Sequence, residues 1–521
     1  MRSISRAERA ARAAPLVLVL AVVALPVVTL LAVAFAHATP ASAELLGHLL
    51  GTVVPAQTAQ GLLAAGGAAL LGAALAAGGL AGALFDFPGR AVLDRALLVP
   101  LLLPTWFVAV VHREVLGARG VGWLGLCLGV GAAPLFHLLG GAALRALPGA
   151  YVDVLRLSGR ARGLAVARHL VPLAFPALGA AAALAALAGW SDAPAARILA
   201  VPTLAVGMLD QWSAREDASA GALFGLGVGA VGLLACAVLL YALGRIRWQD
   251  DARLGASRSR RIRLRGISAA LPWLLAAPQL VLGVVLPWGA IAGWAAQRFE
   301  RVALGTLGGD AAGTLLCATA GTLLAAALGL PILHARAFAP AGRLGRAAAA
   351  LALVPFALPA AVLAAAVLWM SPSGARSGPA AAFNATLLPL VMALGVHLCA
   401  VFVATGLAGL RRQGREHVAL LLLLGHTRLR SLGLLRPFLS RPVAAAAAFV
   451  FLECIKDVQL TTVLSPFGFS SISARVLELA QTERMRDCAV WMLGLGLIGL
   501  YPLMTLARTA RDPEEPEAEP C

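Results

Sequence analysis

A few charged side chains fall within, or at the ends of, the long apolar stretches of this 521-residue chain. Lys456 and Asp457 follow Glu453 by three and four residues, a spacing that places them side by side on a helix surface. Asp192 ends a similar apolar stretch in the first half of the chain. Charge inside a membrane is costly and usually marks a functional position. Two interpretations stay open for these residues: an ion pair that anchors a helix end, or the charged lining of a substrate path.

No residue pattern typical of catalysis is visible. The chain has one lysine, Lys456, which lies between Ile455 and Asp457, whereas an ATP-binding P-loop needs Gly-Lys followed by Ser or Thr. The cysteines are isolated, with no Cys-x-x-Cys pair. His137 and His397 have no nearby acids in sequence and make a poor metal site. We therefore predict no catalytic residue, no metal site and no cofactor, and expect any ATP hydrolysis to occur in a separate chain.

The elements that carry these residues are predicted to be membrane-spanning helices. Apolar residues make up 60% of the chain, charged residues only 13%, and the mean hydropathy is +0.86. A soluble domain has roughly 45–50% apolar and about 25% charged residues. Stretches of about 20 apolar residues recur, which is the length that crosses a bilayer core as a helix, and backbone polar groups in lipid must be satisfied within such a helix. The sequence predicts an all-α polytopic membrane protein.

Twelve apolar segments are visible, in two sets of six that share one orientation. They cover residues 15–36, 60–84, 94–112, 121–144, 173–190 and 219–244, then 268–296, 309–333, 347–371, 383–406, 438–457 and 488–507. We expect two parallel six-helix repeats. The predicted division is a first transmembrane domain (1–244), a basic cytoplasmic linker (245–266), a second transmembrane domain (267–510) and an acidic cytoplasmic tail (511–521).

The net charge of +17 is explained by the positive-inside rule and does not indicate a nucleic-acid partner. With a cytoplasmic N-terminus, the inside segments carry 30 arginines and the outside loops 10. This bias predicts that both termini are cytoplasmic. The basic N-terminus followed by residues 15–36 is interpreted as a retained first helix, because this segment is longer than the usual 7–15-residue core of a signal peptide.

In each set, one long basic inside loop precedes the fifth segment, and the two loops share a pattern. Gly159 lies 17 residues before Pro176, and Gly425 lies 17 residues before Pro442. Each Gly is followed by arginines, an apolar stretch and two prolines. Gly permits a tight turn between short helices, and Pro marks the beginning of the next helix. Such a helix–Gly–helix element can bind a soluble partner at the membrane face; a loop that only obeys the inside rule or touches anionic lipid is the alternative.

These loops resemble the EAA motif of permeases of the binding-protein-dependent ABC importer family. Residues 153–155 (Asp-Val-Leu) and 419–421 (Ala-Leu-Leu) take the Glu-Ala-Ala positions, followed by Gly159 and Gly425. Neither copy has Glu at the first position. The resemblance implies that the loops are coupling helices bound by ATPase subunits, in two copies. The residues it singles out are Asp153, Gly159, Arg160, Arg162 and Pro172 in the first loop, and Glu416, Gly425, Arg428, Arg430 and Pro437 in the second.

The segment 451–493, which contains Phe-Leu-Glu, Lys-Asp and Pro-Phe-Gly-Phe, resembles the second half of fused ferric-iron permeases. Thiamine permeases share the fused layout. The resemblance implies a multi-pass subunit of the bacterial inner (plasma) membrane, surrounded by lipid, that moves ferric iron delivered by an extracytoplasmic binding protein. Thiamine or another small solute is the alternative substrate. The alternative classes are an ion-coupled secondary transporter with a duplicated six-helix fold and a membrane scaffold without transport activity.

Overall fold

Helices make up 88% of the structure, as expected for apolar segments whose backbone groups must pair internally in lipid. The computed structural model describes residues 6–36, 40–145, 147, 149–158, 163–208, 218–244, 261–301, 304–338, 342–370, 378–411, 428–482 and 484–509. Within these ranges, eight helices are long and apolar enough to cross a membrane: Ala14–Ala36, Val54–Leu84, Val121–Arg145, Val166–Ser191, Gly266–Arg298, Leu304–Arg336, Leu388–Leu407 and Met485–Thr509. The chain is an all-α polytopic membrane protein.

Two further candidate spans are sharply bent. The pair Arg90–Leu102 and Thr105–Leu116 bends by 93°, and the pair Arg343–Ala357 and Ala360–Trp369 by 102°. Counting each pair as one span gives up to ten among the described residues. The bends correct the expectation of simple helices over 94–112 and 347–371.

The remaining two predicted segments, 219–244 and 438–457, lie in helices whose side chains are described only in part. They fall on α13 (Ala218–Gly244) and α23 (Arg428–Lys456). The predicted total of twelve spans is therefore not confirmed by the described helices and stays a prediction.

The first half of the chain contains fourteen further described elements in this order: α1 (Arg6–Ala36), α2 (Pro40–Thr52), α3 (Val54–Leu75), α4 (Ala77–Leu84), β1 (Phe85–Asp86), α5 (Arg90–Ala96), η1 (Val99–Leu102), α6 (Thr105–Leu116), α7 (Val121–Arg145), α8 (Gly149–Leu157), α9 (Gly163–Leu170), η2 (Val171–Ala174), α10 (Phe175–Ser191) and α11 (Ala193–Ile198).

The second half begins with β2 (Ile262–Arg263), η3 (Gly266–Ala270), α14 (Leu271–Leu280), the π-helical η4 (Val281–Val285), α15 (Leu286–Arg298), η5 (Phe299–Arg301) and α16 (Leu304–Phe338). It continues with α17 (Arg343–Leu351), α18 (Leu353–Ala357), α19 (Ala360–Trp369), α20 (Gly378–Asn384) and α21 (Leu388–Arg411). After α23 it ends with α24 (Gln459–Leu464), α25 (Ile472–Gln481), η6 (Met485–Cys488) and α26 (Ala489–Thr509).

Small residues bring the central helices into close contact. A Cβ atom on Gly67 of α3 would lie 2.8 Å from the Cα atom of Gly125 in α7, so the two backbones touch there. Close approach at small residues is the usual way in which helices pack in lipid, where the hydrophobic effect does not drive them together. The same helices continue into the main core, which also includes α10, α16, α21 and α23.

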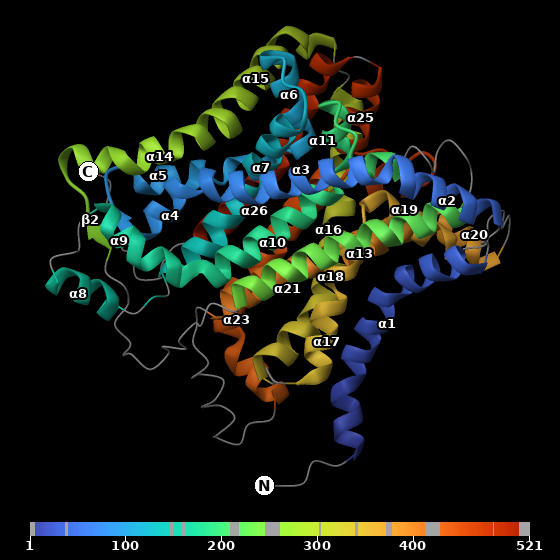
Figure 1. Ribbon diagram of the computed structural model, residues 1–521, viewed down its shortest axis with the longest axis horizontal. Helices are drawn as coiled ribbons and strands as arrows, with labels where there is room; N and C mark the ends of the chain where they lie inside the picture. Colours follow the sequence, from blue (N-terminus) through green and yellow to red (C-terminus); the bar gives the residue numbers. More distant parts are fainter. Residues whose placement is uncertain are drawn as a thin grey trace.

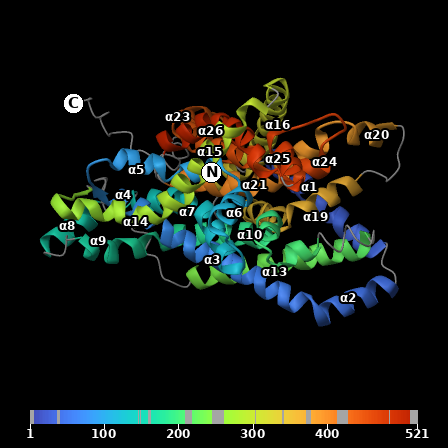
Figure 2. The ribbon, with the colours of Figure 1, turned by 90° about the horizontal axis from the view of Figure 1, so that it is seen from above.

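The first helix of each half packs against the other half. α14 lies along α4, and α1 lies against α17 and α19 (Figures 1 and 2). Near the linker, β1 and β2 pair in parallel, with the Leu264 N–H donating to the Asp86 carbonyl over 2.9 Å. Trp273 of α14 donates to the Pro88 carbonyl over 3.2 Å. These contacts join the end of the predicted linker to the first half; residues 245–260 lie outside the described part.

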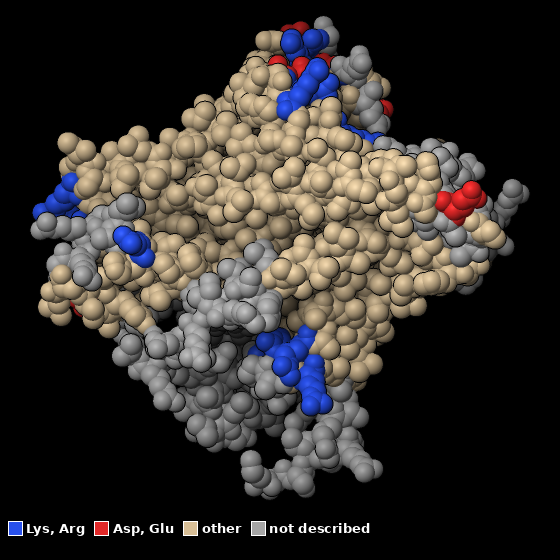
Figure 3. Space-filling view, in the orientation of Figure 1, with Lys and Arg blue, Asp and Glu red and all other residues tan. Residues whose placement is uncertain are grey.

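The ends of the helices gather on two sides of the molecule. In Figure 1, α8 and α9 lie toward the left and α17 and the beginning of α23 toward the bottom, whereas α2, α6, α11, α20 and α25 lie toward the top and right. Figure 3 shows that Lys, Arg, Asp and Glu lie at the edges of this face, with an uncharged surface between them. This distribution is typical of a protein whose middle faces lipid.

Candidate translocation path and coupling surface

The two bent helix pairs carry the same sequence, Leu-Val-Pro-x-x-Leu-Pro, at 98–104 and 353–359. The second proline of each copy, Pro104 and Pro359, has an extended backbone (ψ 142° and 136°) and directly precedes a new helix. Proline lacks an N–H and disfavours a helical residue before it, which explains why both helices break here. The repeat lies inside the apolar segments 94–112 and 347–371, whose apolar length alone predicts unbroken helices.

Each break is buried against the opposite half. Irregular backbone at membrane depth is tolerated only inside protein or beside a water-filled cavity, and residues 103–104 and 358–359 are all buried. η1 lies against α23 and α26, and α18 lies against α10 and α13. Matching glycines make room: a Cβ on Gly499 would lie 2.6 Å from Cδ2 of Leu102, and a Cβ on Gly229 2.6 Å from Cδ2 of Leu358. The two breaks thus form reciprocal contacts between the halves.

Asp192, a predicted path residue, connects the first break to a short helix. Its Oδ1 accepts a hydrogen bond from the N–H of Ala195 over 2.9 Å and so caps the first turn of α11. Its Oδ2 accepts from the hydroxyl of Thr105 over 2.7 Å. Thr105 is the first residue after Pro104. The carboxylate therefore holds α11 to the start of α6, against which α11 packs.

Asp457 has a similar role in the second half, although it lies one residue before Val458, the N-cap residue of α24. Its Oδ1 accepts from the N–H groups of Leu460 and Thr461 over 2.9 and 3.1 Å, in the first turn of α24. α24 packs against α19, as α11 packs against α6. The position of Thr105 is taken by Ala360, the first residue after Pro359, so the second aspartate has no hydroxyl donor there.

The predicted cluster of three charged residues is only partly formed. Lys456 Nζ lies 2.7 Å from Glu453 Oε1, with 12% and 30% of the two side chains exposed. Asp457 bonds instead to α24. Glu453 and Lys456 are thus a half-buried ion pair within α23, and Asp192 bonds in the first half. The structure thus pairs Glu453 with Lys456, whereas each of the two aspartates bonds to the first turn of a short helix. The sequence does not indicate these bonds, because it does not show where α11 and α24 begin.

The first predicted coupling loop is a pair of short helices on the surface. α8 and α9 flank the segment that contains Gly159, and Asp153 is exposed. Two apolar side chains of α8 are exposed as well, Val154 by 62% and Leu157 by 90%. Pro172 lies in η2, at the beginning of the next long helix. This surface offers apolar contact area that a soluble partner could cover.

Several predicted coupling residues lie outside the described part of the structure: Gly159, Arg160, Arg162, Glu416 and Gly425. Arg428, Arg430 and Pro437 fall within α23. They are described as helix only, without their side chains. Of the second predicted coupling loop, the structure therefore describes only the residues that form the beginning of α23.

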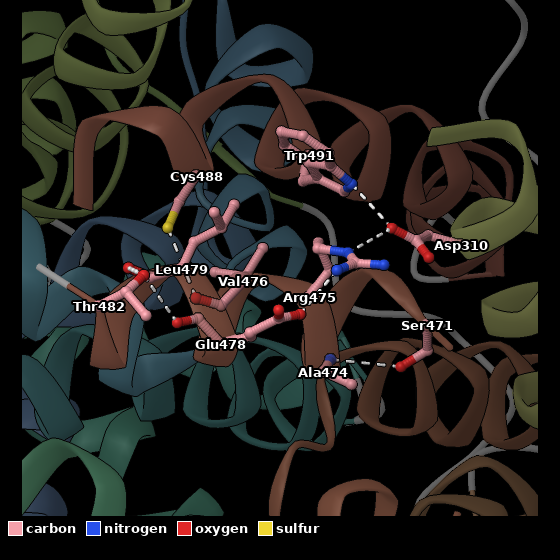
Figure 4. A network of polar contacts seen from close by, with 10 residues as sticks. All are labelled: Asp310, Ser471, Ala474, Arg475, Val476, Glu478, Leu479, Thr482, Cys488 and Trp491. Carbon is pink, nitrogen blue, oxygen red and sulfur yellow. Dashed lines mark hydrogen bonds and ion pairs between the residues drawn. The ribbon is translucent and has the colours of Figure 1, made fainter. Parts of the chain in front are cut away.

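A buried acid missed by the sequence analysis lies near the beginning of α16. Asp310 is 2% exposed, and its Oδ2 accepts from the indole N–H of Trp491 over 2.9 Å and from Nε of Arg475 over 3.3 Å (Figure 4). Arg475 also bonds to Glu478 over 2.7 Å. Asp310 is a lone acid in the apolar stretch 309–333. That feature alone marks it as a functional candidate, because charge in a membrane is costly.

Among the described residues, no group of three or more His, Cys, Asp or Glu side chains could hold a metal ion. His397 contacts the second broken helix instead: its Nδ1 lies 3.0 Å from the carbonyl of Pro355, just before the break.

Compared with protein-family models, with curated proteins and with solved structures, the chain has no match. The fold and site therefore define the class of a helical multi-pass membrane protein with two buried, proline-broken helices.

Proposed function

We propose that this chain is the permease subunit of an ATP-driven importer and that its substrate path runs between two halves of six helices each. The reciprocal contacts of the two proline-broken helices carry this proposal. Discontinuous helices at the interface of parallel or inverted repeats are where many transporters hold their substrates. The two copies of Leu-Val-Pro-x-x-Leu-Pro support a duplicated unit.

Matched elements support the division into two transmembrane domains, 1–244 and 267–510. α11 and α24 follow long helices, bond to an aspartate through N–H groups of their first turns, and pack on the broken helices α6 and α19. α3 packs on α7 as α16 packs on α21. A duplicated six-helix unit explains all of these pairs. Twelve membrane-spanning segments follow if α13 and α23 also cross.

The proposed energy source is a separate pair of ATPase subunits that bind the loops around Gly159 and Gly425. The chain has no P-loop lysine, and α8 exposes Leu157 and Val154 beside the acidic Asp153. In this proposal both termini are cytoplasmic, the protein resides in the bacterial inner membrane, and the side with α6, α11 and α25 faces an extracytoplasmic binding protein. The arginine bias of the predicted inside segments supports this orientation.

The proposed substrate is ferric iron, with thiamine or another small solute as the alternative. The resemblance of residues 451–493 to ferric-iron permeases supports iron. Glu453 and Lys456, the half-buried ion pair of this segment, are the charged groups proposed to line the path.

The coupling surface can be tested on the full chain. A tagged chain is purified from its native membrane in mild detergent, and co-purifying ATPase is quantified by mass spectrometry. We expect Leu157→Asp combined with Asp153→Arg to reduce ATPase recovery at least about tenfold, since it removes an exposed apolar contact that we place in the interface. Glu44→Arg, an exposed acid of α2 on the other side, serves as the control. Unchanged recovery in the loop variant would refute the coupling surface.

An ion-coupled secondary transporter is the second candidate, because a half-buried ion pair and capped aspartates near helix breaks are also found in such carriers. Uptake into proteoliposomes that contain only this chain decides between the two. Uptake driven by a proton gradient, without ATP or an ATPase, would establish the second candidate. Uptake that depends on ATP and the added ATPase supports the first.

A further inference from the structure

The amphipathic helix α25 is held by polar contacts from two other helices, α16 and α23, and one of these contacts also involves α26. Its first N–H, of Ile472, donates to the hydroxyl of Thr314 in α16 over 2.9 Å. The hydroxyl of Ser473 donates to the Ile455 carbonyl in α23 over 2.7 Å. Arg475 pairs with Asp310 of α16, which in turn accepts from Trp491 of α26 (Figure 4).

The Asp310 carboxylate makes the strongest of these contacts. Its side chain is 3% exposed, and one oxygen serves both the guanidinium of Arg475 and the indole of Trp491. Hydrogen bonds between ionised groups are roughly twice as strong as neutral ones, and more so away from water. Removal of one partner of a buried pair is costly because the other charge is then left unsatisfied. α25 can therefore leave α16 only at a substantial cost.

In the first half, residues 204–208 take a corresponding position, and the contacts compared below are those of these five described residues. Residues 204–208 are helical, and the N–H of Val206 donates to the hydroxyl of Thr203 over 3.4 Å, as that of Ala474 donates to Ser471 over 3.3 Å. Gly207 follows its cap by four residues, as Arg475 follows Ser471.

The partner of Gly207 is a neutral side chain. The amide of Gln57, near the beginning of α3, occupies the space that a side chain at position 207 would need. Gln57 thus takes the place in the first half that Asp310 takes in the second. A neutral amide beside a glycine supplies no charge-assisted bond, so Gly207 lacks the ionic contact that Arg475 gives α25 at the matching position.

We propose that Asp310, Arg475 and Trp491 form a latch that keeps α25 closed on the second half, and that the path opens first at residues 204–208 of the first half. The latch is defined by the contacts of these three residues alone. The role of the latch in opening the path rests on the proposed function, because α25 needs to move away from α16 only if the protein is a transporter. Asp310 and Arg475 are positioning residues in this scheme, since they act by holding α25.

The test is hydrogen–deuterium exchange of the full chain in lipid nanodiscs of phosphatidylethanolamine and phosphatidylglycerol, without any ATPase. In the wild type, we expect protection factors of α25 to exceed those of residues 204–208 by at least about tenfold. Asp310→Asn should accelerate exchange in α25 by about 10- to 100-fold, the cost of a lost charge-assisted bond. Trp491→Phe, which keeps the ion pair, should act in the same direction with a smaller change and serves if Asp310→Asn does not fold.

Glu478→Gln is the matched control, because it removes the exposed partner of the same arginine. Glu478 is 63% exposed, and we expect less than about a fivefold change in exchange. Equal protection of α25 and residues 204–208 in the wild type would overturn the unequal opening. Exchange of α25 that is unaffected by Asp310→Asn or Trp491→Phe would overturn the latch. The absence of a co-purifying ATPase would contradict the proposed function and leave the exchange results standing.

Discussion

At the residue scale, the hydrogen bond from Thr105 to Asp192 is the point where a broken helix and a capped helix meet. The bond is 2.7 Å long and partly buried. Thr105→Val keeps the shape but removes the donor, and we expect it to lower the free energy of unfolding by about 1–3 kcal/mol. Thermal unfolding in detergent measures the effect. Thr29→Val is the matched control, because the hydroxyl of Thr29 is exposed and bonds within its own helix; equal effects of the two variants would contradict this role for Thr105.

The ion pair between Glu453 and Lys456 allows its two interpretations to be separated. Lys456→Met leaves a half-buried carboxylate without its cation, so it should destabilise the protein. The double variant Glu453→Gln, Lys456→Met removes both charges and should restore stability. We expect ATP-driven uptake by the double variant to stay at least about tenfold below the wild type. Full recovery of uptake would show that the pair only anchors the helix end.

Single residues also show how much of the site could be predicted from the sequence. Asp192 and Asp457 can be recognised in the sequence as charges at the ends of apolar stretches, but their hydrogen bonds to α11 and α24 depend on where these short helices begin. Asp310 could have been selected by the same reasoning. Its partner Arg475 is 165 residues away in sequence, and no local pattern connects the two.

At the element scale, the matched glycines Gly229 and Gly499 give a prediction that concerns both halves. Replacement of either by Ala places a Cβ 2.6 Å from a leucine of the opposite break. We expect each Gly→Ala variant to lower the free energy of unfolding by about 1–3 kcal/mol, the usual effect of overpacking. The two losses should be similar because the same contact occurs in both halves. Gly289→Ala in α15 is the control, since a Cβ there meets no atom within 4 Å. Unequal losses, or losses no larger than the control's, would contradict the reciprocal contact.

The apolar segments predicted the existence of the helices well because apolar length and backbone pairing are both local properties. The bends at Pro104 and Pro359 were not predicted. A proline can lie in a continuous helix when neighbouring groups satisfy the freed carbonyl: α7 contains Pro134 and α26 contains Pro502 without a comparable break. Whether a proline bends a helix is decided by the packing around it, which a single sequence does not reveal.

At the scale of the whole molecule, the first helix of each half packs against the other half. α14 lies along α4, and α1 lies against α17 and α19. We therefore expect two separate chains, 1–250 and 251–521, to associate when co-expressed, because these contacts do not depend on the covalent linker. Affinity purification of one tagged fragment should recover the other. Recovery of the tagged fragment alone would show that the linker is needed to assemble the halves.

The central claim is that this chain is the membrane part of a machine driven by separate ATPases. Native mass spectrometry of the tagged full chain, purified from its own membrane, tests the claim most directly. The proposal predicts a complex of one permease chain with two copies of an ATPase, which dissociates when Leu157→Asp and Asp153→Arg are introduced. A chain that is isolated without any ATPase, and that takes up solute in proteoliposomes under a proton gradient alone, would contradict it.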